Sequence, residues 1–261
     1  KGARVEEYAG GGRGYVRFVQ VQGGGHAWPG GSAERYRYCD APTAQPDATG
    51  DDPLQSLIMS FIKKRDQKPG NVYLGTLHRL DKPVSGAVVF AKTSKAAERM
   101  SEIIRSKKAL KIYISVTEKG TFGKDGIPER LADALERKGD TTFVKKGAKP
   151  DAFLDILTIR SGKYSVHAIR LVTGKKHQIR AQLSSRGYPI LGDARYGSKE
   201  RLPDGAVALH CLCMGFVHPV KKEPLAIIAP LPSYIAEAAG PAFDPQTIIA
   251  LFGGIAGDNG D

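Results

Sequence analysis

Apolar residues recur along the chain with two different periods, and these periods predict its helices and strands. Between Leu54 and Ile62 they return every three or four positions, which predicts a helix with one apolar face. Asp51-Asp52-Pro53 supplies a cap and a proline suited to a helix start, and Lys68-Pro69-Gly70 an end. The same spacing predicts a second helix over Ser94–Lys107.

Strands are predicted where apolar residues form a continuous run or alternate with polar ones. Val84–Ala91 is continuous, as in a buried strand, whereas Lys111–Thr117 alternates. A short helix near His177–Ser185 can be ended by Gly187. Further strands are predicted over Tyr15–Gln22, Ala152–Ile159, Ser165–Val172 and Val207–Val217. Several strands with few helices between them predict an α+β fold, a mainly antiparallel mixed sheet with flanking helices.

The net positive charge of the chain indicates which kinds of molecule it could bind. The 261 residues include 39 Lys and Arg against 27 Asp and Glu, a formal charge of +12 and a pI near 9.6. Such a surplus favours a polyanionic partner, with nucleic acid first and an anionic membrane second. The alternative is a solvated basic surface with no such partner. At 41% hydrophobic residues, the chain is long enough for one large domain or two small ones.

The cysteines and the apolar runs bear on compartment and metal binding. Cys39, Cys211 and Cys213 are an odd number without the spacing of a disulfide framework. Cys211 and Cys213 lie in an alternating apolar run and lack a second pair, which favours buried thiols over metal ligands. The chain has no run of eighteen apolar residues and no apolar signal core. We therefore expect a soluble cytoplasmic protein without a membrane partner.

A first candidate for chemistry is Asp81 in the stretch TLHRLDKPVSG. It follows the basic pair His78 and Arg79 and precedes Lys82-Pro83, between two apolar runs. Because proline biases the preceding residue away from helix, Asp81 is expected in a loop ahead of the Val84–Ala91 strand. Catalytic groups are often carried by such loops, but a carboxylate that caps a turn would fit as well.

A second candidate is Tyr113 in the alternating run. Its side chain is expected opposite Ile112 and Ile114, on the face shared by Lys111 and Ser115. An aromatic ring on a polar strand face can stack on a base, with its hydroxyl as a polar group. An ordinary cross-strand packing role explains the same pattern.

A third candidate is the stretch LVTGKKHQIRAQL, where Thr173-Gly174 leads from a strand into a helix. Lys175, Lys176, His177 and Arg180 crowd the first turns of this helix, an end that already favours anions. Arg180 could pair with a carboxylate from elsewhere and keep it ionised. Alternatively, the cluster is a phosphate-contacting patch without a catalytic partner. Both interpretations favour nucleic acid.

Together these segments resemble the RluA-type pseudouridine synthases. The resemblance rests on HRLDKPVSGAVVFAK, KIY, TGKKHQIRAQLSSRGYPILGDARYG, ALHCLCMGFVHP and APLP, in the order of that family. It covers about residues 39–234. One departure is Val84, where the family more often has Thr.

The resemblance implies an enzyme that isomerises uridines of ribosomal or transfer RNA without cofactor or metal. Asp81 corresponds to the aspartate that attacks or deprotonates the ribose, and Arg180 to the arginine paired with it. Tyr113 corresponds to the tyrosine that packs on the base and is implicated in removing the C5 proton. Arg79 corresponds to the arginine that fills the space of the flipped base. The expected RNA-binding residues are His78, Arg79, Lys82, Lys175, Lys176 and His177.

The N-terminal residues do not fit the resemblance. The family's opening strand with its N-K-P-x-G end is absent, and residues 13–31 resemble instead the C-terminal end of polyhydroxybutyrate depolymerase or feruloyl esterase-like hydrolases. There His26 would be a triad base, but no G-x-S-x-G serine occurs. We therefore expect an atypical segment over 1–38 (a fusion, frame error or replaced N-terminus), a monomeric catalytic domain over 39–236 and a flexible tail over 237–261. The alternatives are a catalytically impaired RNA-binding paralogue and an esterase fragment.

Overall fold

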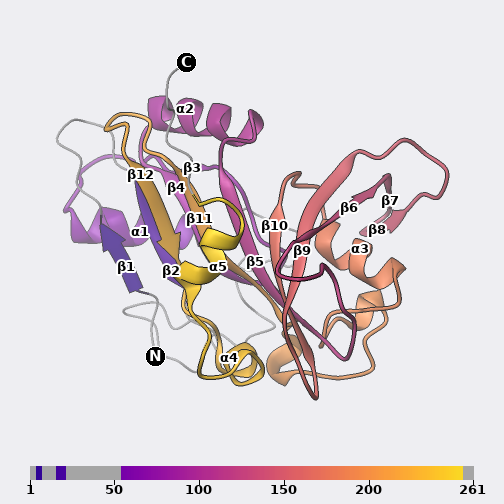
Figure 1. Cartoon of the computed structure of the whole chain (residues 1–261). Coiled ribbons are helices and arrows are strands. Elements are labelled where there is room, and N and C mark those ends of the chain that lie inside the picture. The colour runs from indigo at the N-terminus through magenta and orange to yellow at the C-terminus, as the bar shows by residue number, and fades with distance from the viewer. Residues whose placement is uncertain (1–3, 8–15, 22–53, 255–261) are drawn as a thin grey trace.

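The computed structural model describes residues 4–7, 16–21 and 54–254, which form one large sheet with helices around it (Figure 1). The sheet has ten strands in the order β1-β2-β4-β11-β5-β10-β9-β6, with β12 paired to β11 and β3 to β4. Of the strand pairs described, β4–β11 alone is parallel and the others are antiparallel. The predicted α+β class, with a mainly antiparallel mixed sheet, is therefore confirmed. The strands are β1 (Arg4–Glu7), β2 (Val16–Val21), β3 (Gly75–Thr76), β4 (Ser85–Ala91), β5 (Leu110–Thr117), β6 (Glu129–Asp133), β9 (Ala152–Ser161), β10 (Ser165–Leu171), β11 (Leu209–Val217) and β12 (Pro224–Ile228).

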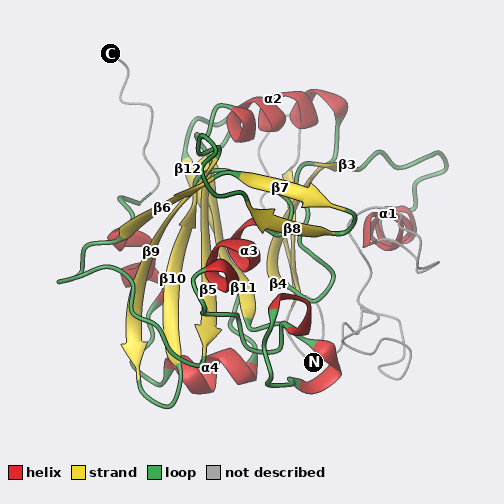
Figure 2. Ribbon diagram, turned by 90° about the vertical axis from the view of Figure 1, so that its right-hand side faces the viewer, coloured by secondary structure: helices red, strands yellow, loops and turns green. Residues whose placement is uncertain are grey.

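The helices surround this sheet, and a separate hairpin stands on one of its faces. Figure 2 shows α3 and the β7–β8 hairpin in front of the sheet, with α2 above it and α4 below. The predicted helices are confirmed within about three residues at their ends. The helices are α1 (Leu54–Arg65), α2 (Ser94–Arg105), α3 (Gln178–Ser185), α4 (Ser233–Ala239) and α5 (Pro245–Leu251), and the hairpin strands are β7 (Leu135–Lys138) and β8 (Thr141–Val144).

Strand β4 separates two hydrophobic clusters because successive side chains of a strand point to opposite faces. Val88 and Phe90 pack with Ile58 and Ile62 of α1. Val89, from the other face, belongs to the main cluster that runs under β5, β9, β10 and β11. This explains why the Val84–Ala91 run does not alternate apolar with polar residues: β4 is buried along its whole length.

Gly86 allows β4 to approach β11. Its φ of +126° lies in a region that L side chains rarely adopt, and a Cβ atom there would lie 2.4 Å from the backbone N and O of Cys211. Gly86 pairs with Cys211 in the parallel ladder. A glycine is therefore required at the start of the strand that follows the Asp81 loop.

The C-terminal residues differ from the expectation of a flexible tail over 237–261. Asp244 caps α5 by accepting hydrogen bonds from the backbone N–H groups of Gln246 and Thr247, and Ile248 and Ile249 are buried in the main cluster. The expectation is wrong for this helix because an Asp-Pro cap and two adjacent apolar residues are enough to dock one short turn.

Other expectations concern residues that the structure describes only in part. Cys211 and Cys213 are buried free thiols, as predicted, whereas Cys39 and His26 lie outside the described residues. The predicted strand Tyr15–Gln22 is confirmed as β2, which pairs antiparallel with β4. Among the described helices, none has the length and apolar character needed to cross a membrane.

Candidate active site

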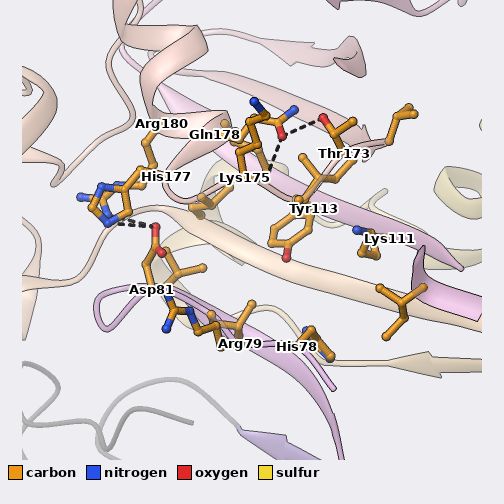
Figure 3. A pocket seen from close by; sticks show the side chains of 18 of the residues that line it. His78, Arg79, Asp81, Lys111, Tyr113, Thr173, Lys175, His177, Gln178 and Arg180 are labelled. Atoms are coloured by element: carbon orange, nitrogen blue, oxygen red, sulfur yellow. Dashed lines mark hydrogen bonds and ion pairs between the residues drawn. The ribbon is translucent and has the colours of Figure 1, made fainter. Parts of the chain in front are cut away.

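A pocket of about 430 Å³ brings together the three residues predicted to be catalytic, Asp81, Tyr113 and Arg180. Its walls come from the loop before β4, from β5, and from the loop that joins β10 to α3 (Figure 3). Arg79 and His78 lie on one side of it, and the α3 residues lie on the other. Its volume suits a small ligand such as one nucleotide base with its sugar.

Asp81 is held in a turn by backbone hydrogen bonds. The Val84 N–H donates to the Asp81 carbonyl at 2.9 Å, and the Val207 N–H donates to the Pro83 carbonyl at 3.1 Å. The turn is thus fixed to the chain that leads into β11. The Asp81 side chain remains 24% exposed, so its carboxylate is both positioned and accessible from the pocket.

Arg180 joins Asp81 to a second carboxylate, Asp193, which lies behind it. The guanidinium Nη1 donates to Oδ2 of Asp81 at 3.1 Å, while Nε and Nη2 donate to the two oxygens of Asp193 at 2.7 and 2.8 Å. The Arg180 and Asp193 side chains are only 4% and 1% exposed. Such a bidentate pair fixes the plane of the guanidinium and therefore the position of Nη1.

Within this group of three side chains, two carboxylates share one guanidinium. Burial acts against the charge of Arg180, but the hydrogen bonds and charge of Asp193, together with Asp81, raise its pKa overall. Arg180 and Asp193 compensate each other, so Asp81 receives a hydrogen bond without full neutralisation. A carboxylate in this state can act as a nucleophile or a base.

Gly192 explains how Asp193 reaches its buried position. With φ of +82°, Gly192 passes so close to the next segment that a Cβ atom would lie 2.1 Å from the Ala206 carbonyl oxygen. Asp193 then precedes the short 3-10 helix Ala194–Tyr196. Sequence reasoning did not single out Asp193 or Tyr196, although the GDARYG segment that contains both was part of the family resemblance.

Tyr113 faces the pocket from β5 and is buried. Burial, the Cys211 side chain opposite it and the charge of Asp81 raise the pKa of its phenol well above the ordinary value. The ring therefore carries a neutral hydroxyl at physiological pH. This agrees with the predicted face of the strand, although Ser115 on that face is fully buried and does not line the pocket.

Lys111 lies two residues before Tyr113 and also lines the pocket. Burial lowers the pKa of its ammonium group. Within the described part of the chain, no hydrogen bond or ion pair to this group is present. A partly buried cation without a partner is unusual in a protein, and it makes Lys111 a candidate for a contact with an electron-rich group of a ligand. Sequence reasoning placed Lys111 on this face but gave it no role.

The loop between β10 and α3 is held by the Gln178 side chain. Its Oε1 accepts from the Thr173 hydroxyl at 2.9 Å and from the Lys175 N–H at 3.1 Å, and its Nε2 donates to the Phe153 carbonyl. These bonds fix the pocket wall opposite Arg79 (Figure 3).

The residues expected to bind RNA lie in two places, the loop before β4 and the loop before α3. The first group is His78, Arg79 and Lys82. His78 accepts a hydrogen bond from the Val89 N–H at 3.0 Å, and burial with the nearby Lys111 lowers its pKa to about 4. It is therefore a neutral structural residue in the pocket wall rather than a cation for phosphates. Arg79 is exposed at the pocket and Lys82 is half-buried beside it.

The cations before α3 are paired with acidic residues. Lys176 contacts Asp140 at 2.9 Å, and Lys175 forms an ion pair with Asp151. Nε2 of His177 lies 3.7 Å from Oδ2 of Asp81, so His177 lies on the same side of the pocket as Asp81. Among the described residues there is no cluster of three or more His, Cys, Asp or Glu side chains that could hold a metal ion.

Comparison with known proteins gives the family. Residues 48–185 match the model of the RNA pseudouridylate synthase family, which is more than half of the chain. The protein therefore belongs to this family, and the resemblance of its motifs to the RluA-type pseudouridine synthases is supported.

Several curated relatives are similar over the same region. An uncharacterized RNA pseudouridine synthase of Synechocystis is 32% identical over 167 residues, which cover 61% of this chain and 50% of that one. The ribosomal large subunit pseudouridine synthase D of Vibrio cholerae is 29% identical, covering 62% and 54%. The tRNA pseudouridine synthase C of Haemophilus influenzae is 30% identical, covering 64% and 77%. The chain spans about half the length of the first two relatives.

The fold is also that of a solved structure. Human RNA pseudouridylate synthase domain containing 1 superposes with a TM-score of 0.61 at 17% identity, covering 95% of each chain. This agreement bears on the fold, which is the one expected for the family.

Proposed function

We propose that this protein is an RNA pseudouridine synthase that isomerises a uridine of ribosomal or transfer RNA without a cofactor or metal. The observation that carries the proposal is the 3.1 Å contact between Asp81 and the buried Arg180, in a pocket that also contains Tyr113. Relatives named for both ribosomal and transfer RNA support RNA as the substrate. We expect the reaction to take place in the cytoplasm and the chain to act as a monomer.

In the proposed reaction, the Asp81 carboxylate attacks or deprotonates the ribose of a flipped uridine. The C1′–N1 bond then breaks with its electron pair left on the uracil, the uracil turns within the pocket, and C5 bonds to C1′. As this bond forms, Asp81 leaves C1′ or returns the ribose proton, according to which route it took. The C5 proton passes to solvent water, and N1 takes up a proton from water. Tyr113 packs on the base during this rotation. The raised pKa of Tyr113 favours this packing role over that of a proton acceptor, because a phenol that keeps its proton is not a base.

Lys111 is proposed to supply a positive charge close to the departing uracil. When the bond to N1 breaks, the electron pair stays with the uracil, and negative charge spreads over its carbonyl oxygens. Lys111 lies in the same pocket as Tyr113, without an internal partner among the described residues. Its ammonium group is proposed to stabilise this charge, as oriented cations and dipoles do in other active sites.

Binding of the RNA is assigned to the cations around the pocket. The exposed Arg79 is proposed to enter the space left by the flipped base, and Lys82, Lys175 and Lys176 to contact phosphates. Flipping costs a few kcal/mol and is least costly in a loop that is already single-stranded. Binding through these cations should weaken as the salt concentration rises.

The test uses total RNA from cells that lack the gene, labelled with tritium at C5 of uridine. The unmodified chain is expected to release tritium, and Asp81→Asn is expected to release none while it still binds the RNA in a filter assay. Undiminished release by Asp81→Asn would refute the mechanism. An unmodified chain that binds RNA but releases no tritium would instead support the catalytically impaired RNA-binding protein. A hydrolase function is not proposed, because the sequence has no G-x-S-x-G serine to partner His26.

A further inference from the structure

His177 begins α3 in an unusual backbone conformation. Its φ of 54° and ψ of 21° are left-handed, and its side chain makes no capping hydrogen bond to the helix. Serine, threonine, aspartate and asparagine are preferred at this position because their oxygen accepts from the first helical N–H groups. A non-glycine residue in the left-handed region is uncommon in proteins. The His177 ring is therefore expected to be used elsewhere.

The ring lies between Tyr196 and Asp81. Its Nδ1 atom is 3.0 Å from the Tyr196 hydroxyl, and its Nε2 atom is 3.7 Å from Oδ2 of Asp81. The two rings meet edge to face, with centroids 5.7 Å apart. Tyr196 also lies under the Arg180 guanidinium, whose central carbon is 4.9 Å from the ring centroid. The same tyrosine thus supports both groups that approach Oδ2.

The direction of these hydrogen bonds is fixed by Thr142 in strand β8. Its backbone N–H, which can only donate, donates to the Tyr196 hydroxyl oxygen at 2.9 Å. Burial raises the pKa of Tyr196, so the hydroxyl keeps its single hydrogen. The hydrogen of that hydroxyl needs an acceptor, and among the described residues the other hydrogen-bond partner is Nδ1 of His177, so we assign the hydroxyl as the donor to Nδ1.

A neutral imidazole carries one N–H, and its position follows. Burial lowers the pKa of His177 to about 4 even though Asp81 acts in the opposite direction. The ring is therefore neutral at physiological pH. Because Nδ1 accepts from Tyr196, the hydrogen must be on Nε2, the atom nearest Asp81.

We propose that Thr142, Tyr196 and His177 form a hydrogen-bond relay that presents the His177 Nε2–H to Oδ2 of Asp81. Tyr196 and His177 are then positioning residues for the catalytic carboxylate, a role that rests on the function proposed above. At 3.7 Å the last contact is longer than a hydrogen bond, and catalytic contacts commonly shorten when substrate fills the site.

The relay also distinguishes the two oxygens of Asp81. Arg180 and His177 both approach Oδ2. No hydrogen bond or ion pair reaches Oδ1 from the residues that the structure describes. Because His177 and Arg180 at the start of α3 both approach Oδ2, Oδ1 is the oxygen left to act on the ribose.

The direct test is the tautomer of His177 in the free protein, measured by nitrogen-15 NMR with a histidine variant for assignment. The relay predicts a neutral ring with its hydrogen on Nε2. Tyr196→Phe keeps the aromatic ring at position 196 but removes its hydroxyl. Without this donor to Nδ1, the His177 tautomer with its hydrogen on Nδ1 should also be populated. A wild-type ring with its hydrogen on Nδ1 would overturn the relay. This measurement needs no RNA, so it does not depend on the proposed activity.

Kinetics with the tritiated RNA test the positioning role. Tyr196→Phe is expected to lower kcat about tenfold or more with little change in KM, since a hydrogen bond toward a charged group is weakened. Tyr188→Phe is the matched control: Tyr188 packs its ring against Phe122, and its hydroxyl should not matter. An unchanged kcat for Tyr196→Phe, with normal folding by circular dichroism, would contradict the positioning role.

Two substitutions of His177 separate the donor at Nε2 from the backbone requirement. Of the two replacements, asparagine better tolerates the left-handed backbone, but its shorter side chain places the amide N–H near the position of Nδ1. Glutamine is one methylene longer, so its amide N–H can reach the position of Nε2. The relay predicts that His177→Gln retains more activity than His177→Asn. The opposite order would show that the backbone, and not the donor, is what matters. A wild-type chain with the Nε2–H tautomer but no tritium release would overturn the proposed function and leave the relay supported.

Discussion

Asp81 and Arg180 lie 99 residues apart in the sequence, yet Oδ2 of Asp81 and Nη1 of Arg180 meet at 3.1 Å. Asp81 is carried by the turn before β4, and Arg180 by α3, which follows β10. In the sheet, β11 and β5 lie between β4 and β10, so α3 must cross back over them to bring the arginine to the carboxylate. Tyr113 on β5 lies below this crossing and completes the pocket.

Asp193 is expected to stabilise the fold as well as orient Arg180. Asp193→Asn would leave the buried guanidinium with weaker compensation, and removal of one partner of a buried pair typically costs about 3–5 kcal/mol. We expect the free energy of unfolding, measured with urea, to fall by about that amount. Glu102→Gln is the control, because Glu102 pairs with Arg105 on an exposed helix surface where the loss should be small. Equal stabilities of the two variants would contradict the structural role of Asp193.

Local sequence pattern was enough for the central elements of the fold. The apolar spacing of α1 and α2 and the alternation of β5 each report which side of an element is buried, and these elements lie against the main sheet. The hairpin strands β7 and β8 were missed because they are four residues long and mostly exposed or half-buried: β7 is largely charged and β8 begins with two threonines, so no apolar alternation marks them. Strand β12 was missed because it is a short apolar run that begins with proline and shows no alternation of apolar and polar residues.

The site was predictable in part. Asp81, Tyr113 and Arg180 each broke the local pattern of apolar and polar residues, and the family resemblance grouped them. The partners behind Arg180 could not be read from local pattern, because Asp193 and Tyr196 look like ordinary turn residues, and only the fold brings them against Arg180. His78 shows the opposite case: beside an arginine it suggested a cation, but the structure uses its half-buried ring as a hydrogen-bond acceptor.

Gly86→Ala is expected to destabilise the protein strongly. The added methyl group would collide with the Cys211 backbone at a φ that disfavours any side chain. The loss should be about 3 kcal/mol or more, since strain and steric overlap add. Thermal and urea unfolding measure it, with Gly162→Ala as the control because nothing lies within 4 Å of its added Cβ atom. If both alanines left stability unchanged, the close parallel pairing of β4 with β11 would be wrong.

Lys111→Met is expected to lower the rate of isomerisation more than the affinity for RNA. Methionine keeps the length and apolar stem of the side chain but removes the charge proposed to stabilise the departing uracil. We expect kcat for tritium release to fall about tenfold or more, with RNA binding within about twofold of the original. Lys124→Met is the control, because Lys124 is highly exposed and does not line the pocket. A loss of binding equal to the loss of rate would show that Lys111 acts as a phosphate contact instead.

Stability is expected to fall as the pH drops below neutrality because several histidines are buried in the neutral form. Burial lowers the pKa of His167 and His210 to about 4, and burial together with Lys111 does the same for His78. Histidines of the unfolded chain titrate near pH 6.5, so between about pH 6.5 and 4 the unfolded chain binds more protons than the folded one.

The free energy of unfolding should therefore decrease through this window as the pH falls, by about 1.4 kcal/mol per pH unit for the fully buried His210. Urea unfolding at about pH 7 and about pH 5 measures the slope. His210 lies between the Ser85 hydroxyl, 2.8 Å from Nδ1, and the Ala229 carbonyl. His210→Gln removes its titration and should make the slope shallower, whereas a stability that does not change between the two pH values would show that these rings are not held neutral in the folded protein.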